Sequence, residues 1–318
     1  MPVFRRPEAG HARRTDAGAP RLERALTLTL PAHTADLPAP GTTALDTARA
    51  HWEEIAGRAL PGWLPNDPVG YHEMAHAVGR ALGPAELSGV DLIVLAMGVP
   101  DWRHETMPGA VLAGMTHSDP LVLGVAEQGP TAPFTALRIA ASRLATGRCR
   151  RALVVLMEQP TLPPCPVGGE RPGTASAVAL LLATGPGPGP RLGPVRISVA
   201  GRPCDAPTTA PYPSTDRPDL AAAGRARTVL AGPGLAGRGP APGVRLVPAD
   251  PRLPATGVWA ALARRLAAGP GTDTELLVAD RDPALPYRCA VPLTWTPTAP
   301  DPDTPATGRP APHKELVP

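Results

Sequence analysis

The chain has 318 residues, of which 43% are hydrophobic, and a formal net charge of +3 at pH 7. This length and composition exclude a largely disordered chain and favour a globular protein with a sizeable core. The small net charge, without a basic run interleaved with aromatic residues, argues against nucleic-acid binding. Neither a membrane-spanning apolar run nor an apolar N-terminal segment is present in the sequence, which predicts a cytoplasmic protein that does not bind a membrane.

The elements expected before residue 160 alternate between strands and helices, after a mobile tail at residues 1–20. Apolar residues recur with a period of two in the strand at 22–30 and with helical spacing in the helices, whereas the later strands are continuous apolar runs. The predicted strands are 22–30, 90–97, 120–126 and 152–158. The predicted helices are 43–60, 70–82, a short one within 100–115, and 134–145, which follows a sharp turn over 128–133.

The elements expected after residue 160 are shorter and are separated by segments rich in proline and glycine. A proline-rich loop spans 160–172, and a Gly-Pro spacer spans 185–190. The predicted strands are 173–182, 196–199, 244–247, 275–279 and 288–295, and the predicted helices are 219–230 and 256–268. Residues 296–318 are predicted to be a disordered C-terminal tail.

An internal repeat relates the two parts of the chain. A shift of 122 positions places residues 141–147 on 263–269, and it places 153–157 near 275–279. Alternating strands and helices with such a repeat predict an α/β protein made of two pseudo-repeated halves. The expected boundaries are 21–184 for the first half and 185–295 for the shortened second half.

The order and spacing of these stretches resemble the thiolase-like fold and, within it, the ketoacyl synthase III type of condensing enzyme. The resemblance implies a five-layer αβαβα fold and a dimer. It also implies a Cys at the start of the first-half helix that accepts an acyl group from a thioester. We expect neither a cofactor nor a metal. The stretches that carry the resemblance are 91–96 with 100–101, 108–115, 134–158, 173–182 and 258–295.

The nucleophile that this resemblance implies is missing from the sequence. Counting back along the 134–145 helix places the position of the nucleophile at Pro130, between Gly129 and Thr131. Gln128, ahead of the turn, still resembles the family's sequence. None of these residues is a thiol, and proline also lacks the N–H that would help to form an oxyanion hole.

The second half should supply a His and an Asn, and both are missing as well. No histidine lies between His117 and His313, and no asparagine follows Asn66. The Asn position falls on Arg252, and the 122-residue shift carries Pro130 to the same residue. The sequence therefore predicts a degenerate site with no catalytic residue, formed by Gln128, Gly129, Pro130, Thr131 and Arg252.

These absences favour a non-catalytic ketosynthase-like subunit, similar to chain-length factors, in polyketide or fatty-acid biosynthesis. It would pair through the first-half strand and helix, as a homodimer or as a heterodimer with an active ketosynthase, and an acyl carrier protein is a further candidate partner. The alternative is an active acyltransferase or condensing enzyme with a rearranged site.

A remote alternative is a zinc metalloprotease, because His72-Glu73-Met74-Ala75-His76 has the H-E-x-x-H spacing on a predicted helix. The third ligand position of the extended motif is Leu82, so a solvated helix face is favoured. The polar residues 101–105 are similarly expected to form a solvated loop or subunit contact. His117-Ser118-Asp119 is expected to form a turn.

The four cysteines, at positions 149, 165, 204 and 289, show no C-x-x-C spacing and are predicted to be free thiols. Cys149 lies between arginines, which are expected to lower the pKa of its thiol. Cys165 lies in the proline-rich loop without a nearby His, so a surface thiol is favoured over a nucleophile.

Overall fold

A computed structural model describes ten segments of the chain: residues 18–30, 42–60, 69–98, 101–103, 107–160, 172–199, 228–235, 243–269, 274–282 and 287–295. Both predicted tails, apart from residues 18–20, lie outside these segments, as do Cys165 and Cys204. No helix in the described segments is long and apolar enough to cross a membrane.

The first half contains five strands in the order β3 (Leu121–Ala126), β2 (Leu92–Met97), β4 (Arg151–Glu158), β5 (Ala175–Ala183) and β1 (Arg21–Leu30). β2 runs parallel to β3 and β4, and β5 runs antiparallel to β4 and β1. β4 and β5 are buried along nearly their whole length, which fits their continuous apolar sequences.

The second half repeats this strand order and these directions. Its order is β9 (Arg245–Pro248), β8 (Thr228–Ala231), β10 (Glu275–Arg281), β11 (Tyr287–Thr294) and β6 (Arg191–Leu192), and β7 (Arg196–Val199) also pairs with β11. β8 is parallel to β9 and β10, and β11 is antiparallel to β10 and β6. β1 and β6 pair at the seam and join the halves into one 11-stranded sheet.

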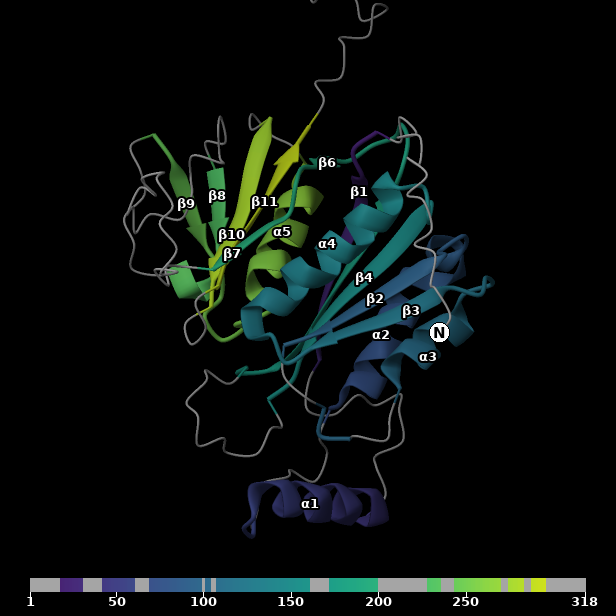
Figure 1. The fold of residues 1–318 in the computed structure, drawn as a ribbon, viewed down its shortest axis with the longest axis vertical. Helices are drawn as coiled ribbons and strands as arrows, with labels where there is room; N and C mark the ends of the chain where they lie inside the picture. The colour runs from purple at the N-terminus through teal and green to yellow at the C-terminus, as the bar shows by residue number, and fades with distance from the viewer. Residues whose placement is uncertain are drawn as a thin grey trace, which may run out of the picture.

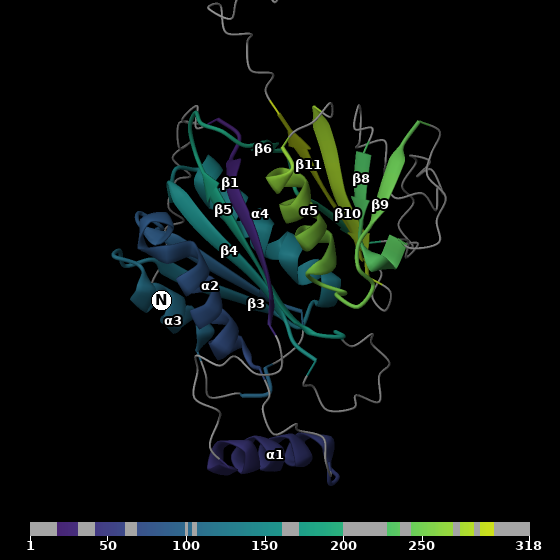
Figure 2. The ribbon, with the colours of Figure 1, turned by 180° about the vertical axis from the view of Figure 1, so that it is seen from behind.

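Two helices lie between the halves of the sheet, which diverge on either side of them (Figures 1 and 2). These are α4 (Ala132–Ala145) and α5 (Gly257–Ala267), and both contribute to the largest buried core. Phe134 of α4 and Trp259 of α5 are in contact, with ring centroids 4.9 Å apart. The core between the halves is therefore built around the two repeated helices.

Three further helices belong to the first half of the chain. α2 (Tyr71–Leu87) and α3 (Pro108–Met115) cover the face of its sheet that points away from α4 (Figure 2). α2 is kinked at Gly83, whose φ is 73° and which precedes Pro84. α1 (Thr42–Ala56) lies apart from the sheet (Figure 1), where the Trp52 indole donates a hydrogen bond of 3.1 Å to the Trp102 carbonyl.

The 122-residue repeat appears directly in this architecture. α4 ends at Ala145 and α5 at Ala267, which are 122 positions apart. Glu158 at the end of β4 and Asp280 near the end of β10 are separated by the same interval. The predicted α/β class with two pseudo-repeated halves is confirmed. The described residues form the outer helices of the first half, its sheet, the α4–α5 layer and the second sheet, and residues 200–227 lie outside them.

One predicted element is wrong where the structure describes it. The expected helix at 219–230 lies outside the described residues up to position 227, and its last three residues belong to strand β8. Thr228–Ala231 is buried between β10 and β9 and pairs in parallel with both. Pairing on both edges outweighs the weak helical pattern of the preceding Ala-rich stretch. The two-residue strand β6 was not predicted.

Candidate functional site

The sharp turn predicted over residues 128–133, before the helix at 134–145, is present between β3 and α4. Glu127 has a φ of 60°, and it is the one non-glycine residue with positive φ in the described part of the chain. Gly129 follows with a φ of 49° and begins the short helix η1 (Gly129–Thr131), which runs directly into α4. A left-handed conformation is costly for a residue with a side chain, so this backbone is held by its surroundings.

A side-chain hydrogen bond links this turn to α4, and the turn carries no thiol. The Thr135 hydroxyl donates a hydrogen bond of 2.7 Å to the side-chain oxygen of Gln128. Pro130 is half-buried and Thr131 is only 3% exposed. Pro130 offers neither a thiol nor a backbone N–H, although its fixed φ suits the first turn of a helix.

Arg252, at the predicted Asn position, lies on the surface beside the turn that precedes β5. Its carbonyl accepts a hydrogen bond of 2.7 Å from the Gly173 N–H. Its exposed guanidinium pairs with Asp250 at 2.9 Å, and this hydrogen bonding lowers the pKa of the Asp250 carboxyl. The side chain therefore pairs with a neighbour in the chain.

The segments that precede α4 and α5 come together at Gly98, which follows β2. A Cβ atom added to Gly98 would lie 2.9 Å from the Ala255 Cβ and 3.6 Å from the Gly129 carbonyl oxygen. The structure thus brings the turn that contains Gly129 close to the segment that leads into α5. No side chain larger than that of glycine fits at position 98 without displacement.

A buried carboxyl that sequence inspection missed lies beside this meeting point. Glu158 is 1% exposed and accepts hydrogen bonds from the N–H groups of Ala255, at 2.8 Å, and Thr256, at 2.9 Å. The Thr256 hydroxyl also bonds to Glu158 and lies 3.0 Å from the Ser176 hydroxyl. Burial raises the pKa of Glu158 to about 7, although these hydrogen bonds oppose the increase. A charged residue ending the apolar strand β4 could have revealed this site.

A second set of buried polar residues lies on the second-half side of the α4 entrance. Asp280 accepts hydrogen bonds from the N–H groups of Gly234 and Arg281, and burial raises its pKa to about 7. An Asp282 carboxylate oxygen lies 3.0 Å from where a Cβ of Gly129 would be. Cys289 lies near Thr131 and both aspartates, and burial raises the pKa of its thiol to about 12.

The expected lowering of the Cys149 thiol pKa is wrong. Cys149 is buried rather than exposed between its arginine neighbours, and burial raises the pKa of its thiol to about 11. The nearby Asp91 carboxylate adds to this increase, and Arg143 only partly opposes it. The two cysteines that the structure describes, Cys149 and Cys289, are therefore poorly suited to act as nucleophiles.

The H-E-x-x-H residues lie in the first turns of α2. Glu73 is 8% exposed, and it accepts a hydrogen bond from the Gly70 N–H at 2.9 Å and one from Arg103 at 2.9 Å. The rings of His72 and His76 lie 4.8 Å apart, and burial, followed by His72, lowers the pKa of His76. Glu73 thus caps its helix and pairs with Arg103, and both contacts occupy the carboxylate that a protease would need as a base.

The remaining polar residues have structural partners. Asp101 accepts a hydrogen bond from the Tyr71 N–H at 3.1 Å, and the Arg103 guanidinium lies 5.2 Å from the centre of the Trp102 ring. Ser118 bonds to the Val90 carbonyl within the expected turn. Asp101 and Arg103 are partly exposed and also have partners within the chain, while residues 104–105 lie outside the described segments. The expectation of a solvated loop or subunit contact at 101–105 therefore stays a prediction.

Comparisons with known proteins show which fold this architecture represents. No family model matches the chain, and no curated protein matches its sequence. Among solved structures, AbyA1, a tetronic acid condensing enzyme, is 18% identical, with a TM-score of 0.57 over 87% of this chain and 100% of that one.

Two further solved structures come from Xanthomonas species. FabH, the 3-oxoacyl-(acyl carrier protein) synthase III of Xanthomonas oryzae, is 13% identical, with a TM-score of 0.54 over 87% of this chain and 99% of that chain. Cerulenin-bound OleA of Xanthomonas campestris is 12% identical, with a TM-score of 0.56 over 88% and 99%. At these identities the comparisons establish the fold alone: the chain has the thiolase-like fold of ketoacyl synthase III-type condensing enzymes.

Proposed function

We propose that this chain is a non-catalytic, ketosynthase-like subunit that pairs with an active ketosynthase in polyketide or fatty-acid biosynthesis. The observation that carries the proposal is Pro130. It lies at the entrance to α4, on an intact strand–turn–helix, at the position where the family resemblance implies an acyl-accepting cysteine. The scaffold of the site is present, whereas the group that would form the thioester is replaced by a residue with no reactive atom.

The first-half edge of the sheet supports a partner. Among the described residues, β3 pairs only with β2, and neither β3 nor α3 carries a charged residue. Leu121 of β3 is 42% exposed, and Met107, which precedes α3, is 74% exposed. An uncharged strand edge with exposed apolar side chains is prone to pair with another strand. The proposed occupant is the matching edge of an active ketosynthase.

The competing proposal is an acyltransferase with a rearranged site. Its best candidate nucleophile is Cys289, which lies near Thr131 at the α4 entrance. The thiolate required for attack is strongly disfavoured there, because the pKa is raised to about 12. This chemistry would need a rearrangement that exposes the thiol, so the subunit proposal fits the described geometry better.

One experiment separates these proposals. The chain is purified alone and together with a ketosynthase from the same organism, incubated with an acyl thioester, and analysed by pull-down and intact-protein mass spectrometry. We expect the two proteins to co-purify and the acyl adduct to form on the ketosynthase alone. An adduct on this chain that disappears in Cys289→Ser would instead establish the acyltransferase. If this chain associates only with itself and carries no acyl adduct, the proposed heterodimer with a ketosynthase is wrong.

A further inference from the structure

A pocket of about 410 Å³ opens at the seam between the two halves. It lies beside the C-terminal end of α5, at the opposite end of that helix from Thr256 and the degenerate site. Its lining includes the charged side chains of Arg21, Glu23, Arg24 and Arg191 and the apolar side chains of Leu266 and Trp295. Its volume lies within the range of small-molecule sites.

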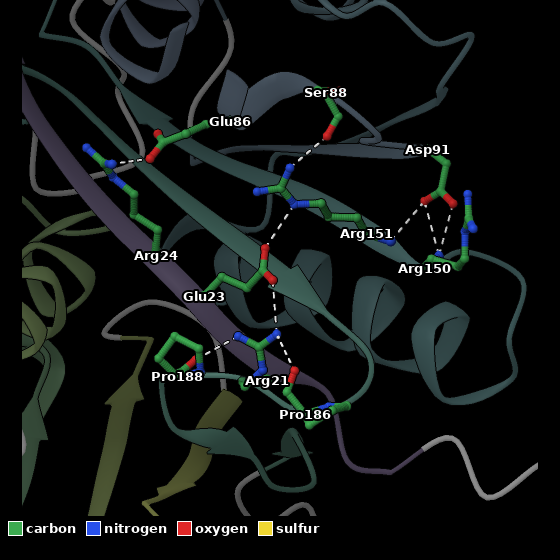
Figure 3. Close-up of polar contacts among 10 residues, drawn as sticks. All are labelled: Arg21, Glu23, Arg24, Glu86, Ser88, Asp91, Arg150, Arg151, Pro186 and Pro188. Carbon is green, nitrogen blue, oxygen red and sulfur yellow. Dashed lines mark hydrogen bonds and ion pairs between the residues drawn. The ribbon is translucent and has the colours of Figure 1, made fainter. Parts of the chain in front are cut away.

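The pocket brings together more positive than negative charge. Arg21 and Arg191 are directly opposite each other on β1 and β6, a placement that is unfavourable for like charges. The carboxylate in the lining, Glu23, is shared between Arg21 at 3.0 Å and Arg151 at 2.9 Å (Figure 3). Arg24 pairs with Glu86 instead. Arg191 has no carboxylate partner among the described residues.

The buried guanidinium of Arg21 is held rigidly in this lining. Arg21 is 6% exposed and donates hydrogen bonds to the carbonyls of Pro188, at 2.6 Å, and Pro186, at 3.3 Å (Figure 3). Its Nε atom is buried without a hydrogen-bond partner in the described structure. The positive charge of Arg21 is therefore fixed beside the pocket, so little ordering is required when an anion binds there.

The second cation is more available. The Arg191 guanidinium donates one long hydrogen bond, of 3.4 Å, to the Ala19 carbonyl, which leaves most of its N–H groups without a partner in the described segments. Its planar donor fork matches the geometry of a carboxylate. Leu266 and Trp295 supply an apolar surface in the same lining, which a purely inorganic ion would not use.

We propose that this seam pocket binds a small organic anion, a carboxylate carried on an apolar body. Arg191, with the field of Arg21, holds the carboxylate, and Leu266 and Trp295 contact the apolar part. The site is separate from the degenerate site at Pro130, so this proposal does not depend on the proposed function. Because its lining comes from both halves, the bound ligand also stabilises their association.

Isothermal titration calorimetry on the full chain tests the proposal with octanoate, its neutral analogue octanamide, and inorganic phosphate. We expect octanoate to bind at least about tenfold more tightly than either of the other two, because only octanoate combines a carboxylate with an apolar chain. Arg191→Gln removes the charge, and it should weaken octanoate binding by about tenfold or more. The matched control is Arg196→Gln, an exposed arginine of β7 outside the pocket, which should leave binding within about twofold.

Trp295→Ala provides a second readout if the Arg191 variant does not fold. It should weaken octanoate binding and leave any phosphate binding unchanged. Failure of octanoate to bind, equal binding of octanamide, or octanoate binding that is insensitive to both variants would overturn the proposal. Equal binding of phosphate and octanoate would overturn its apolar part.

Discussion

The carboxylate of Glu158, in the first half of the fold, accepts hydrogen bonds from both the backbone N–H and the hydroxyl of Thr256, in the second half. Thr256 immediately precedes α5, so Glu158 supplies negative charge where the helix presents its free N–H groups and partial positive charge. The end of one half's central strand thereby holds the start of the other half's central helix.

This buried contact makes stability depend on pH. Burial raises the pKa of Glu158 from its ordinary value of 4.5 to about 7, so the folded state binds the proton more tightly than the unfolded state does. The free energy of unfolding should therefore fall as the pH rises from about 4.5 to about 7, by about 3 kcal/mol from this residue. Burial raises the pKa of Asp280 to about 7 as well, so this residue adds a further decrease in the free energy of unfolding as the pH rises.

Urea denaturation between pH 4.5 and pH 8 measures this effect. Glu158→Gln cannot ionise, so its stability should fall by about 3 kcal/mol less over this range than that of the wild type. Glu54→Gln, at an exposed position on α1, is the matched control and should behave as the wild type does. A Glu158→Gln profile parallel to the wild type would contradict a raised pKa at this residue.

Removing the Thr256 hydroxyl should destabilise the joint between the halves. Thr256→Val keeps the shape of the side chain but removes a donor to a buried carboxylate, which costs about 1.5–3 kcal/mol. Ser176→Ala, which leaves the Glu158 bonds intact, should cost less, about 1 kcal/mol. Chemical denaturation at pH 8, where Glu158 is mostly ionised, provides both values, and equal losses in the two variants would argue against a special role for the Thr256–Glu158 contact.

The two described thiols should resist alkylation in the folded protein. Cys149 and Cys289 are buried, with pKa values raised to about 11 and about 12, so their thiolate fractions at pH 8 are very small. Iodoacetamide should label both at least about 100-fold more slowly in the native protein than after denaturation, as followed by peptide mass spectrometry. Introducing a thiol by Pro130→Cys, at the entrance to α4, should create a faster-reacting position. Labelling of Cys289 at the rate of the new thiol would favour the acyltransferase.

The apolar edge at β3 should control association with the partner. Leu121→Lys places a charge on the exposed edge strand and should reduce co-purification with a ketosynthase by about tenfold or more, because a buried unpaired charge is costly at an interface. Val199→Lys, at a 61% exposed apolar position on β7, is the control and should have little effect. Loss of association in the control, but not in Leu121→Lys, would move the interface away from β3.

Strands β2, β4 and β5 could be predicted from sequence because each is a continuous apolar run buried in the sheet, and β1 could be predicted from its alternating pattern. The repeat was also visible, since Arg143-Leu144 and Arg265-Leu266 stand at the same place in two helices that end 122 positions apart. The helix predicted for 219–230 is wrong at residues 228–230, which belong to β8, because the four residues of that strand are too few to show a strand pattern without their two pairing partners.

The polar residues around the site were the least predictable. Glu158 ends a strand and Thr256 lies 98 positions later, so no local pattern connects them. Cys149 was misjudged for a related reason: its arginine neighbours in sequence suggested a lowered thiol pKa, whereas packing buries the sulfur and raises it. Charge neighbours in the chain do not reveal the dielectric surroundings of a group.

The sequence by itself determined the repeated α/β pattern and the absence of a thiol at Pro130, because both depend only on which residues occur and how they are spaced. The tertiary structure alone decided that Glu158 caps α5 across the two halves, that Arg252 pairs with Asp250 at the surface, and that Arg21 and Arg191 meet at the seam. Packing of one half against the other brings together Glu158 with Thr256 and Arg21 with Arg191, which lie far apart in the chain. The Arg252–Asp250 pair instead depends on how the local backbone turns.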